Sequence, residues 1–125
     1  MYDIEFYENK NGKSQLHEYI KYLKNSTDKG NRQKLKKITM YIDLLGEYGL
    51  TLTEPYIKKL DNELWELRPL RDRILFASWY NNKFILLCIF IKKTKKTPQK
   101  EIERAKKFLK DYKNRRNKTL ENGKM

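Results

Sequence analysis

Apolar runs divide the middle of the chain into three expected strands with almost no loop between them. They cover residues 64–69, 71–80 and 83–91, and the third is the most apolar stretch of the protein. Asn81-Asn82 separates the last two strands, and asparagine tolerates the left-handed backbone of a tight hairpin. Because Ile, Leu, Phe, Trp and Tyr suit a pleated, half-buried surface, the pattern predicts an antiparallel sheet.

The segments before this sheet show one strand pattern and then two helical patterns. Residues 2–7 alternate between apolar and polar side chains, as in a strand with one buried face. Ser14 can cap the first helix, and apolar residues recur at helical spacing after it. The second helix is expected over about residues 31–45, with Gly46 and Gly49 ending it. A short polar loop joins the two, so we expect a helical hairpin laid on the sheet.

A last helix is expected after the sheet, with Thr97 as its cap and Pro98 as its first residue. Residues 49–63 show no regular pattern. Residues 113–125 also lack periodicity, and we expect them to form a basic tail that is frayed or ordered by a partner. A run of strands with segregated helices indicates an α+β fold, in a single domain over residues 1–112.

The distribution of charge indicates a polyanionic partner. The chain of 125 residues has a formal net charge of +13. Residues 1–91 hold 15 basic and 12 acidic groups, whereas residues 92–125 hold 14 basic and 4 acidic groups. The positive field is therefore concentrated just after the apolar strand, and it favours nucleic acid over a membrane. A lysine-rich face that is merely solvated would give the same count.

Several observations point to the cytoplasm. The N-terminus has no apolar core of a signal peptide. No apolar run reaches the roughly 18 to 20 residues needed to cross a bilayer, so no membrane partner is expected. The one cysteine, Cys88, lies in the apolar strand, where a small buried thiol suits a reducing compartment.

Most catalytic chemistries lack a signature in this chain. There is no glycine-rich phosphate loop, no elbow motif for a nucleophilic serine, and no spacing of cysteine and histidine typical of zinc. The one histidine, His17, lies beside the apolar stripe of the first helix and is expected at the surface. We expect neither a metal nor a cofactor.

The basic rim of the sheet is the remaining candidate. Strand alternation places Glu66 and Arg68 on one face. On the next strand it places Arg73, Leu75 and Ala77 on one face, opposite Ile74 and Phe76. Guanidinium groups match phosphate oxygens in pairs and could stabilise the charge of a phosphorane-like transition state. Glu66 could accept a proton from a ribose 2′-hydroxyl, and a lysine could do the same or protonate the leaving oxygen. Equally, Glu66 and Arg68 could form a simple ion pair beside solvated lysines.

These considerations define two sets of candidate residues. The candidates for catalysis are Arg68, Arg73, Glu66 and Lys93. The candidates for RNA binding are Arg71, Lys92, Lys95 and Lys96.

Four segments together resemble the RelE/HigB toxin superfamily of type II toxin–antitoxin systems, with most similarity to its phage-derived HigB-like branch. The segments are LWELRP, RDRILF, the long run FILLCIFIKKTKKTPQKEIERAKKFLKDY, and the upstream PYIKKLDNELWELR. The resemblance covers roughly residues 2–112. It is specific in combination, although each segment alone would be weak.

The resemblance implies a compact α+β toxin like the microbial ribonucleases. Relatives cleave mRNA without a metal ion, typically in the ribosomal A site. An antitoxin partner, often of helix-turn-helix type, neutralises them and gives them contact with operator DNA. By position, Arg68 and Arg73 match the sheet arginines of the family, and Lys92, Lys93 and Lys96 match its lysines. Many relatives carry a His or Tyr near the C-terminus; here Tyr112 is on an apolar stripe and is expected in the core.

The leading hypothesis is therefore a ribosome-dependent mRNA endoribonuclease toxin that inhibits translation. Two alternatives stay open. A toxin of the same fold could inhibit DNA gyrase without catalysis, and charge alone would also suit a plain nucleic-acid-binding module.

Overall fold

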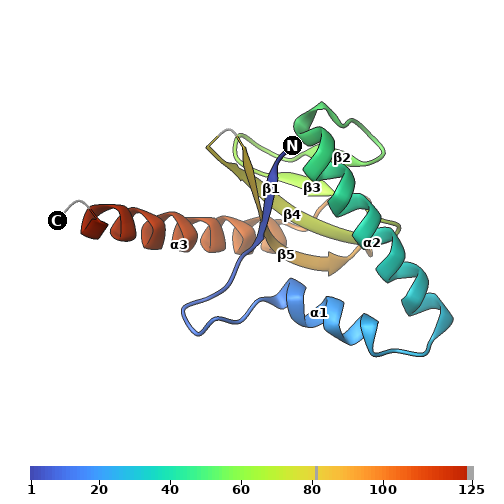
Figure 1. Ribbon diagram of the computed structural model, residues 1–125. Coiled ribbons are helices and arrows are strands. Elements are labelled where there is room, and N and C mark those ends of the chain that lie inside the picture. Colours follow the sequence, from blue (N-terminus) through green and yellow to red (C-terminus); the bar gives the residue numbers. More distant parts are fainter. Residues whose placement is uncertain (81, 124–125) are drawn as a thin grey trace.

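A computed structural model describes residues 1–80 and 82–123 and shows a sheet between two helical layers (Figure 1). The strands are β1 (Asp3–Phe6), β2 (Ile57–Lys59), β3 (Trp65–Leu67), β4 (Asp72–Trp79) and β5 (Lys83–Ile91). The helices are α1 (Gln15–Lys24), α2 (Lys29–Tyr48), the short 3-10 turn η1 (Gly49–Thr51) and α3 (Gln99–Gly123). The predicted α+β class is confirmed.

The antiparallel pairing predicted for the strands over residues 64–91 is confirmed, and the sheet as a whole is mixed. Its order is β1-β5-β4-β3-β2, and β2, β3, β4 and β5 pair antiparallel. β1 runs parallel to β5, with Ile4 opposite Phe84. Periodicity predicted the strand at residues 2–7 but not its partner, because alternation reports which side chains are buried and carries no strand direction.

One further expectation about strands needs correction, and another falls partly outside the described residues. β2 lies within residues 49–63, which showed no regular pattern; it has only three residues, of which Ile57 alone is buried. The predicted hairpin link falls on Asn81, which is outside the described residues. Tyr80, just before it, has a φ of 57° and so takes the left-handed backbone of a turn.

Each face of the sheet has its own core. Ile74 and Phe76 of β4 point to the side of α1 and α2, whereas Leu75 and Ala77 point to the side of α3. The alternation predicted for β4 is thus confirmed, as is the helical hairpin on the sheet. α1 contributes Leu16 and Leu23 to the first core, α2 contributes Ile38 and Leu45, and α3 contributes Ala105, Leu109 and Tyr112 to the second.

Helix boundaries differ from the prediction where contacts with distant segments decide them. α2 continues through Gly46, whose carbonyl accepts the backbone N–H of Tyr2 at 2.7 Å, and it ends before Gly49, which has a φ of 60°. An added Cβ at position 46 would lie 3.6 Å from the Tyr2 carbonyl oxygen, which is an ordinary van der Waals distance, so space alone does not require glycine there. Only Gly49 ends the helix.

α3 is the largest departure from the prediction. It continues through Gly123, whereas residues 113–125 were expected to be irregular. Lys113 pairs with Glu63, and Arg116 pairs with Glu5, both at 2.6 Å. Beyond its apolar stripe, the helix is therefore connected to other segments by ion pairs. Lys124 and Met125 lie outside the described residues. None of the helices described here is long and apolar enough to cross a membrane.

Candidate functional site

Glu66 is the centre of a charged cluster on the α3 side of the sheet. Its side chain comes from β3 and is 3% exposed. The Oε1 atom lies 3.5 Å from Nε of Arg68 and 3.7 Å from Nε of Arg73. Two guanidinium groups therefore converge on a single carboxylate oxygen, because β3 and β4 are neighbouring antiparallel strands.

Arg73 is held more firmly than Arg68. Its Nη1 donates to the backbone carbonyls of Leu70 and Asp72 at 2.8 and 2.9 Å. Its side chain is 7% exposed, against 21% for Arg68, whose other close carboxylate is Glu54 at 3.8 Å. Burial, followed by the nearby charge of Arg68, lowers the pKa of Arg73 below its ordinary value. Two cations are thus held together at a cost that the Glu66 carboxylate between them offsets only in part.

Thr97 completes the cluster in a way that the sequence analysis did not predict. Its hydroxyl donates to Oε2 of Glu66 at 2.6 Å. α3 begins at Gln99, and the carbonyl of Pro98 accepts the N–H of Glu101 and Ile102. Thr97 therefore acts on Glu66, and the prediction that Thr97 caps a helix starting at Pro98 is wrong.

A small hollow of about 10 Å³ opens over this cluster, and we call it the arginine hollow. The loop after β5 forms one wall, shaped in part by the Thr94 hydroxyl, which donates to the carbonyl of Lys96 at 2.7 Å. Glu66 is the one carboxylate among the described residues that line it. Seven cationic side chains line it as well: Lys58, Arg68, Arg73, Lys92, Lys93, Lys95 and Lys96.

A second hollow adjoins the first and contains the remaining predicted residue. Arg71 lines it together with Arg73, Lys92, Lys93 and Lys95. Arg71 and Lys92 are linked through the backbone, since the N–H of Lys92 donates to the carbonyl of Arg71 at 2.7 Å. The structure thus brings all eight predicted residues around two hollows that share a wall. Their individual roles stay predictions.

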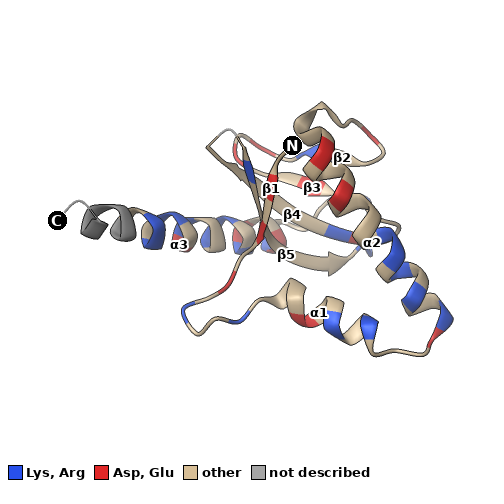
Figure 2. Cartoon of the chain, in the orientation of Figure 1, with Lys and Arg blue, Asp and Glu red and all other residues tan. Residues whose placement is uncertain are grey.

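The ion pair expected as the plainer alternative is also present, but it is part of a larger arrangement. A simple pair would join Glu66 to Arg68, whereas Glu66 faces two arginines and a threonine. In Figure 2, lysines and arginines also mark the start of α2 and recur along α3. The positive surface is therefore broader than the site.

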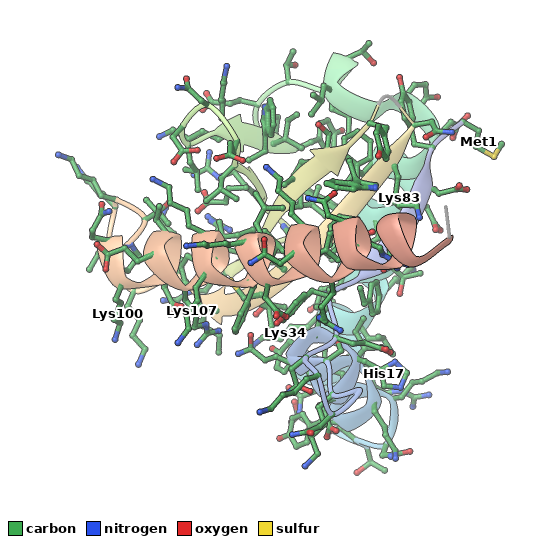
Figure 3. All side chains as sticks on the ribbon, turned by 90° about the vertical axis from the view of Figure 1, so that its left-hand side faces the viewer. Met1, His17, Lys34, Lys83, Lys100 and Lys107 are labelled. Carbon is green, nitrogen blue, oxygen red and sulfur yellow. The ribbon has the colours of Figure 1, made fainter. Side chains whose placement is uncertain are left out.

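Three residues were predicted to lie outside the candidate site, and each has the exposure or burial that the sequence predicted. His17 is exposed on α1, and Figure 3 shows it on the helical layer away from α3. Cys88 is fully buried, and burial raises its pKa to about 11, so the thiol is protonated at neutral pH. Tyr112 is 4% exposed and belongs to the α3 core, where its hydroxyl donates to Glu5 at 3.1 Å.

The site contains residues that sequence reasoning missed. Lys58 comes from β2, which the sequence did not reveal, and Thr97 has a side-chain partner 31 residues away. The one sequence signal for Lys58 was its position in the PYIKKL segment, two residues before Leu60, because that segment is part of the family resemblance. Among the side chains of residues 1–80 and 82–117, no group of three or more His, Cys, Asp or Glu is placed to hold a metal ion.

A family model described as "Phage derived protein Gp49-like (DUF891)" matches residues 22–110. The matched region runs from α1 into α3 and includes every residue of the arginine hollow. No curated protein matches the chain.

Proposed function

The chain belongs to the phage-derived Gp49-like family, a family of the RelE/HigB toxin type, and on that premise we propose that it is a HigB-like mRNA endoribonuclease toxin. It would be the toxin of a type II toxin–antitoxin system and would cleave mRNA on the ribosome without a metal ion. The observation that carries the proposal is the convergence of Arg68 and Arg73 on Glu66 in a hollow lined by lysines.

The proposed reaction is an internal transfer at one phosphodiester. The ribose 2′-oxygen attacks the adjacent phosphorus, the bond from phosphorus to the 5′-oxygen breaks, and the 2′-hydroxyl loses its proton. The products are a 2′,3′-cyclic phosphate and a 5′-hydroxyl. Arg68 and Arg73 would hold the phosphate and stabilise the added negative charge of the transition state, since positioned cations are worth most in a site with little water.

Lys93 is assigned the protonation of the leaving 5′-oxygen. It lines both hollows, so it lies on the wall along which RNA would pass. An ammonium group carries a proton to give and is mobile on its four-carbon chain. Arg71, Lys92, Lys95 and Lys96 would bind the neighbouring phosphates as a strip of positive charge.

Two roles are open to Glu66. It could take the proton of the 2′-hydroxyl, because it is the carboxylate of the arginine hollow. Its contacts favour the other role, in which it holds the two guanidinium groups in place and the proton passes to water. Oε1 already faces both arginines, and Oε2 accepts the hydroxyl of Thr97. We therefore treat Glu66 as a positioning residue.

The proposal includes partners. An antitoxin, of helix-turn-helix type in many such systems, would neutralise the chain and alone connect it with operator DNA. A protein that cuts mRNA on ribosomes would act in the cytoplasm. Purification with a small acidic or amphipathic partner encoded beside it would support this part of the proposal.

The test is cleavage of mRNA on translating ribosomes by the wild-type chain and by a variant with both Arg68→Ala and Arg73→Ala. Wild type should fragment the mRNA and leave 2′,3′-cyclic phosphate ends, and the double variant should not. A folded double variant that still cleaves would overturn the assignment. Growth arrest with intact mRNA and a DNA-damage response would instead favour gyrase inhibition, and harmless expression would favour a plain binding module.

A further inference from the structure

A cleft of about 580 Å³ lies between α1, the end of β5 and the start of α3. It adjoins the arginine hollow, with which it shares Phe90, Lys93, Thr94 and Pro98. Lys93 and Thr94 also line the second cationic hollow. Figure 3 shows Lys100, which lines the cleft, extending from α3 on the side where α1 lies. A single strand of RNA could therefore have one phosphate at the arginine hollow and a neighbouring base in this cleft.

The cleft exists because β5 loses its neighbour halfway along. β1 pairs with residues 83–86 only. Farther on, the N–H of Ile89 donates to Oε1 of Gln15 at 3.2 Å, and the same oxygen accepts Nη2 of Arg104 at 2.7 Å. The side chain of Gln15 thus satisfies the backbone where a sixth strand would pair. An added peptide strand would have to displace Gln15, so this cleft is better suited to a compact ligand than to an extended peptide.

Asp72 supplies the chemistry of the cleft. It lines the cleft, yet its side chain is 1% exposed. Oδ1 accepts the hydroxyl of Tyr19 at 3.2 Å, and Lys34 Nζ lies 3.4 Å from that hydroxyl. Oδ2 has no hydrogen-bond partner among the described residues. A buried acceptor without a donor is costly, so a ligand that brings an N–H group would be favoured there.

We propose that this cleft binds the nucleobase next to the phosphate held by Arg68 and Arg73. Oδ2 of Asp72 accepts the exocyclic amino group of adenine, cytosine or guanine, and the site disfavours uracil. The assignment rests on the proposed function, because it takes RNA as the ligand.

The rest of the lining agrees with a flat heterocycle. Ile89, Phe90, Ile91 and Pro98 offer apolar surface to the faces of a base, and Lys93 and Lys100 can hold flanking phosphates. Uracil has one N–H on its pairing edge, between two carbonyl oxygens. When that N–H donates to Oδ2, the two flanking oxygens repel the carboxylate, whereas an exocyclic amino group donates to it without two such neighbours.

The test uses nucleoside 5′-monophosphates as probes and methyl NMR of isoleucine-labelled wild-type protein, which is expressed together with the proposed antitoxin and refolded after that partner is removed in denaturant. AMP, CMP or GMP should shift the Ile89 and Ile91 methyl signals, and UMP should bind at least threefold more weakly. Asp72→Asn, which adds a donor at the same volume, should bring UMP within about twofold of AMP. Equal shifts from UMP and AMP in wild type would overturn the proposal.

A second variant leaves the buried group untouched. Ile91 is 44% exposed, so Ile91→Trp should fold and fill the cleft, and it should abolish the nucleotide-dependent shift of Ile89. Met40→Trp, at an exposed site on α2, is the matched control and should leave that shift unchanged. Ile89 and Ile91 signals that stay unchanged with AMP, CMP and GMP would overturn the base site and leave the proposed function standing. Failure of the ribosomal cleavage assay alone would leave the base site intact, because this measurement requires no cleavage.

Discussion

Two hollows on this protein combine carboxylates with cations, but in different proportions. The arginine hollow is lined by one carboxylate, Glu66, and seven lysines or arginines. A hollow between β1 and α3 is lined by two carboxylates, Glu5 and Glu8, and two arginines, Arg115 and Arg116. Both use the same side-chain chemistry, so the difference between them lies in the balance of charge and not in the kind of residue.

The balanced hollow has the contacts of a structural joint. Glu5 of β1 accepts Lys83 of β5 at 3.2 Å, Arg116 of α3 at 2.6 Å and the hydroxyl of Tyr112 at 3.1 Å. Its charge is used to connect three elements. In the arginine hollow, cations outnumber the carboxylate by seven to one, and the excess attracts a further anion. The comparison teaches that excess charge, and not the presence of ion pairs, distinguishes the candidate site.

The largest predicted effect separates the arginines of the two hollows. Losing both Arg68 and Arg73 should lower the rate of mRNA cleavage by more than about 10³-fold, because each positioned donor is commonly worth about 10² to 10³. Arg116→Ala is the matched control, since it removes a guanidinium that also pairs with a carboxylate. It should leave the cleavage rate within about twofold.

The rate of mRNA cleavage on translating ribosomes is measured for each variant, and circular dichroism shows whether each variant folds. Because Arg73 is buried, a variant with Arg68→Lys and Arg73→Lys should accompany the alanine pair, keeping positive charge near Glu66 while losing paired contact with phosphate. Equal losses in the Arg116 variant and the double variant would remove the distinction between the hollows.

The second effect concerns Glu66. If this carboxylate positions the two guanidinium groups, Glu66→Gln should lower the cleavage rate about 10- to 100-fold through misplacement, with no change in the shape of the pH–rate profile. If it is the general base, the acidic limb of the profile should disappear in the variant. Rates between pH 5 and 9 distinguish the two roles, and loss of the limb would refute the positioning role.

The third effect separates lysines of the hollow from lysines elsewhere. Lys93→Ala should weaken RNA binding and reduce the slope of log affinity against log salt by about 0.7, the value for one phosphate contact on a single strand. Lys107→Ala, an exposed change on α3 outside the described hollows, should alter that slope less. Binding titrations from 50 to 300 mM salt measure both slopes, and equal changes would mean that the positive field acts without a preferred strip.

The sequence was sufficient to predict the arginine hollow in outline. Alternation alone placed Arg73 on the face opposite Ile74. Side chains on a strand alternate between its two faces, so identifying the buried face fixes the direction of every side chain. The lysines follow directly after β5, so their position at its end needed no tertiary information. The family resemblance pointed to the same residues.

The finer features required coordinates because they depend on segments far apart in the chain. Nothing near Thr97 indicates that its hydroxyl donates to Glu66, and β2 with Lys58 is too short to give a periodic signal. Helix α3 runs past Tyr112 without a continuing apolar stripe, with ionic contacts to Glu63 and Glu5. The cleft beside Asp72 arises because β1 stops short of the end of β5, which no local pattern encodes.

The smallest predicted effect is on stability in the balanced hollow, and its sign depends on pH. Burial alone would raise the pKa of Glu5, but hydrogen bonds from Arg116 and Lys83 outweigh it, so the pKa lies below the ordinary value of 4.5. A carboxyl with a lowered pKa contributes stability above its unfolded pKa and loses it as pH falls through the folded one. Its side chain is 29% exposed, so solvent screening limits the contribution.

Glu5→Gln should therefore lower the free energy of unfolding by about 1 kcal/mol at pH 7, and the difference from wild type should shrink as the pH falls below 4.5. The cleavage rate should not change, because Glu5 lies outside the arginine hollow. Urea unfolding at pH 7 and pH 3.5 measures both free energies. An equal destabilisation at pH 7 and pH 3.5 would show that Glu5 acts through packing and not through its charge. A large loss of cleavage would show that the two hollows form one functional surface.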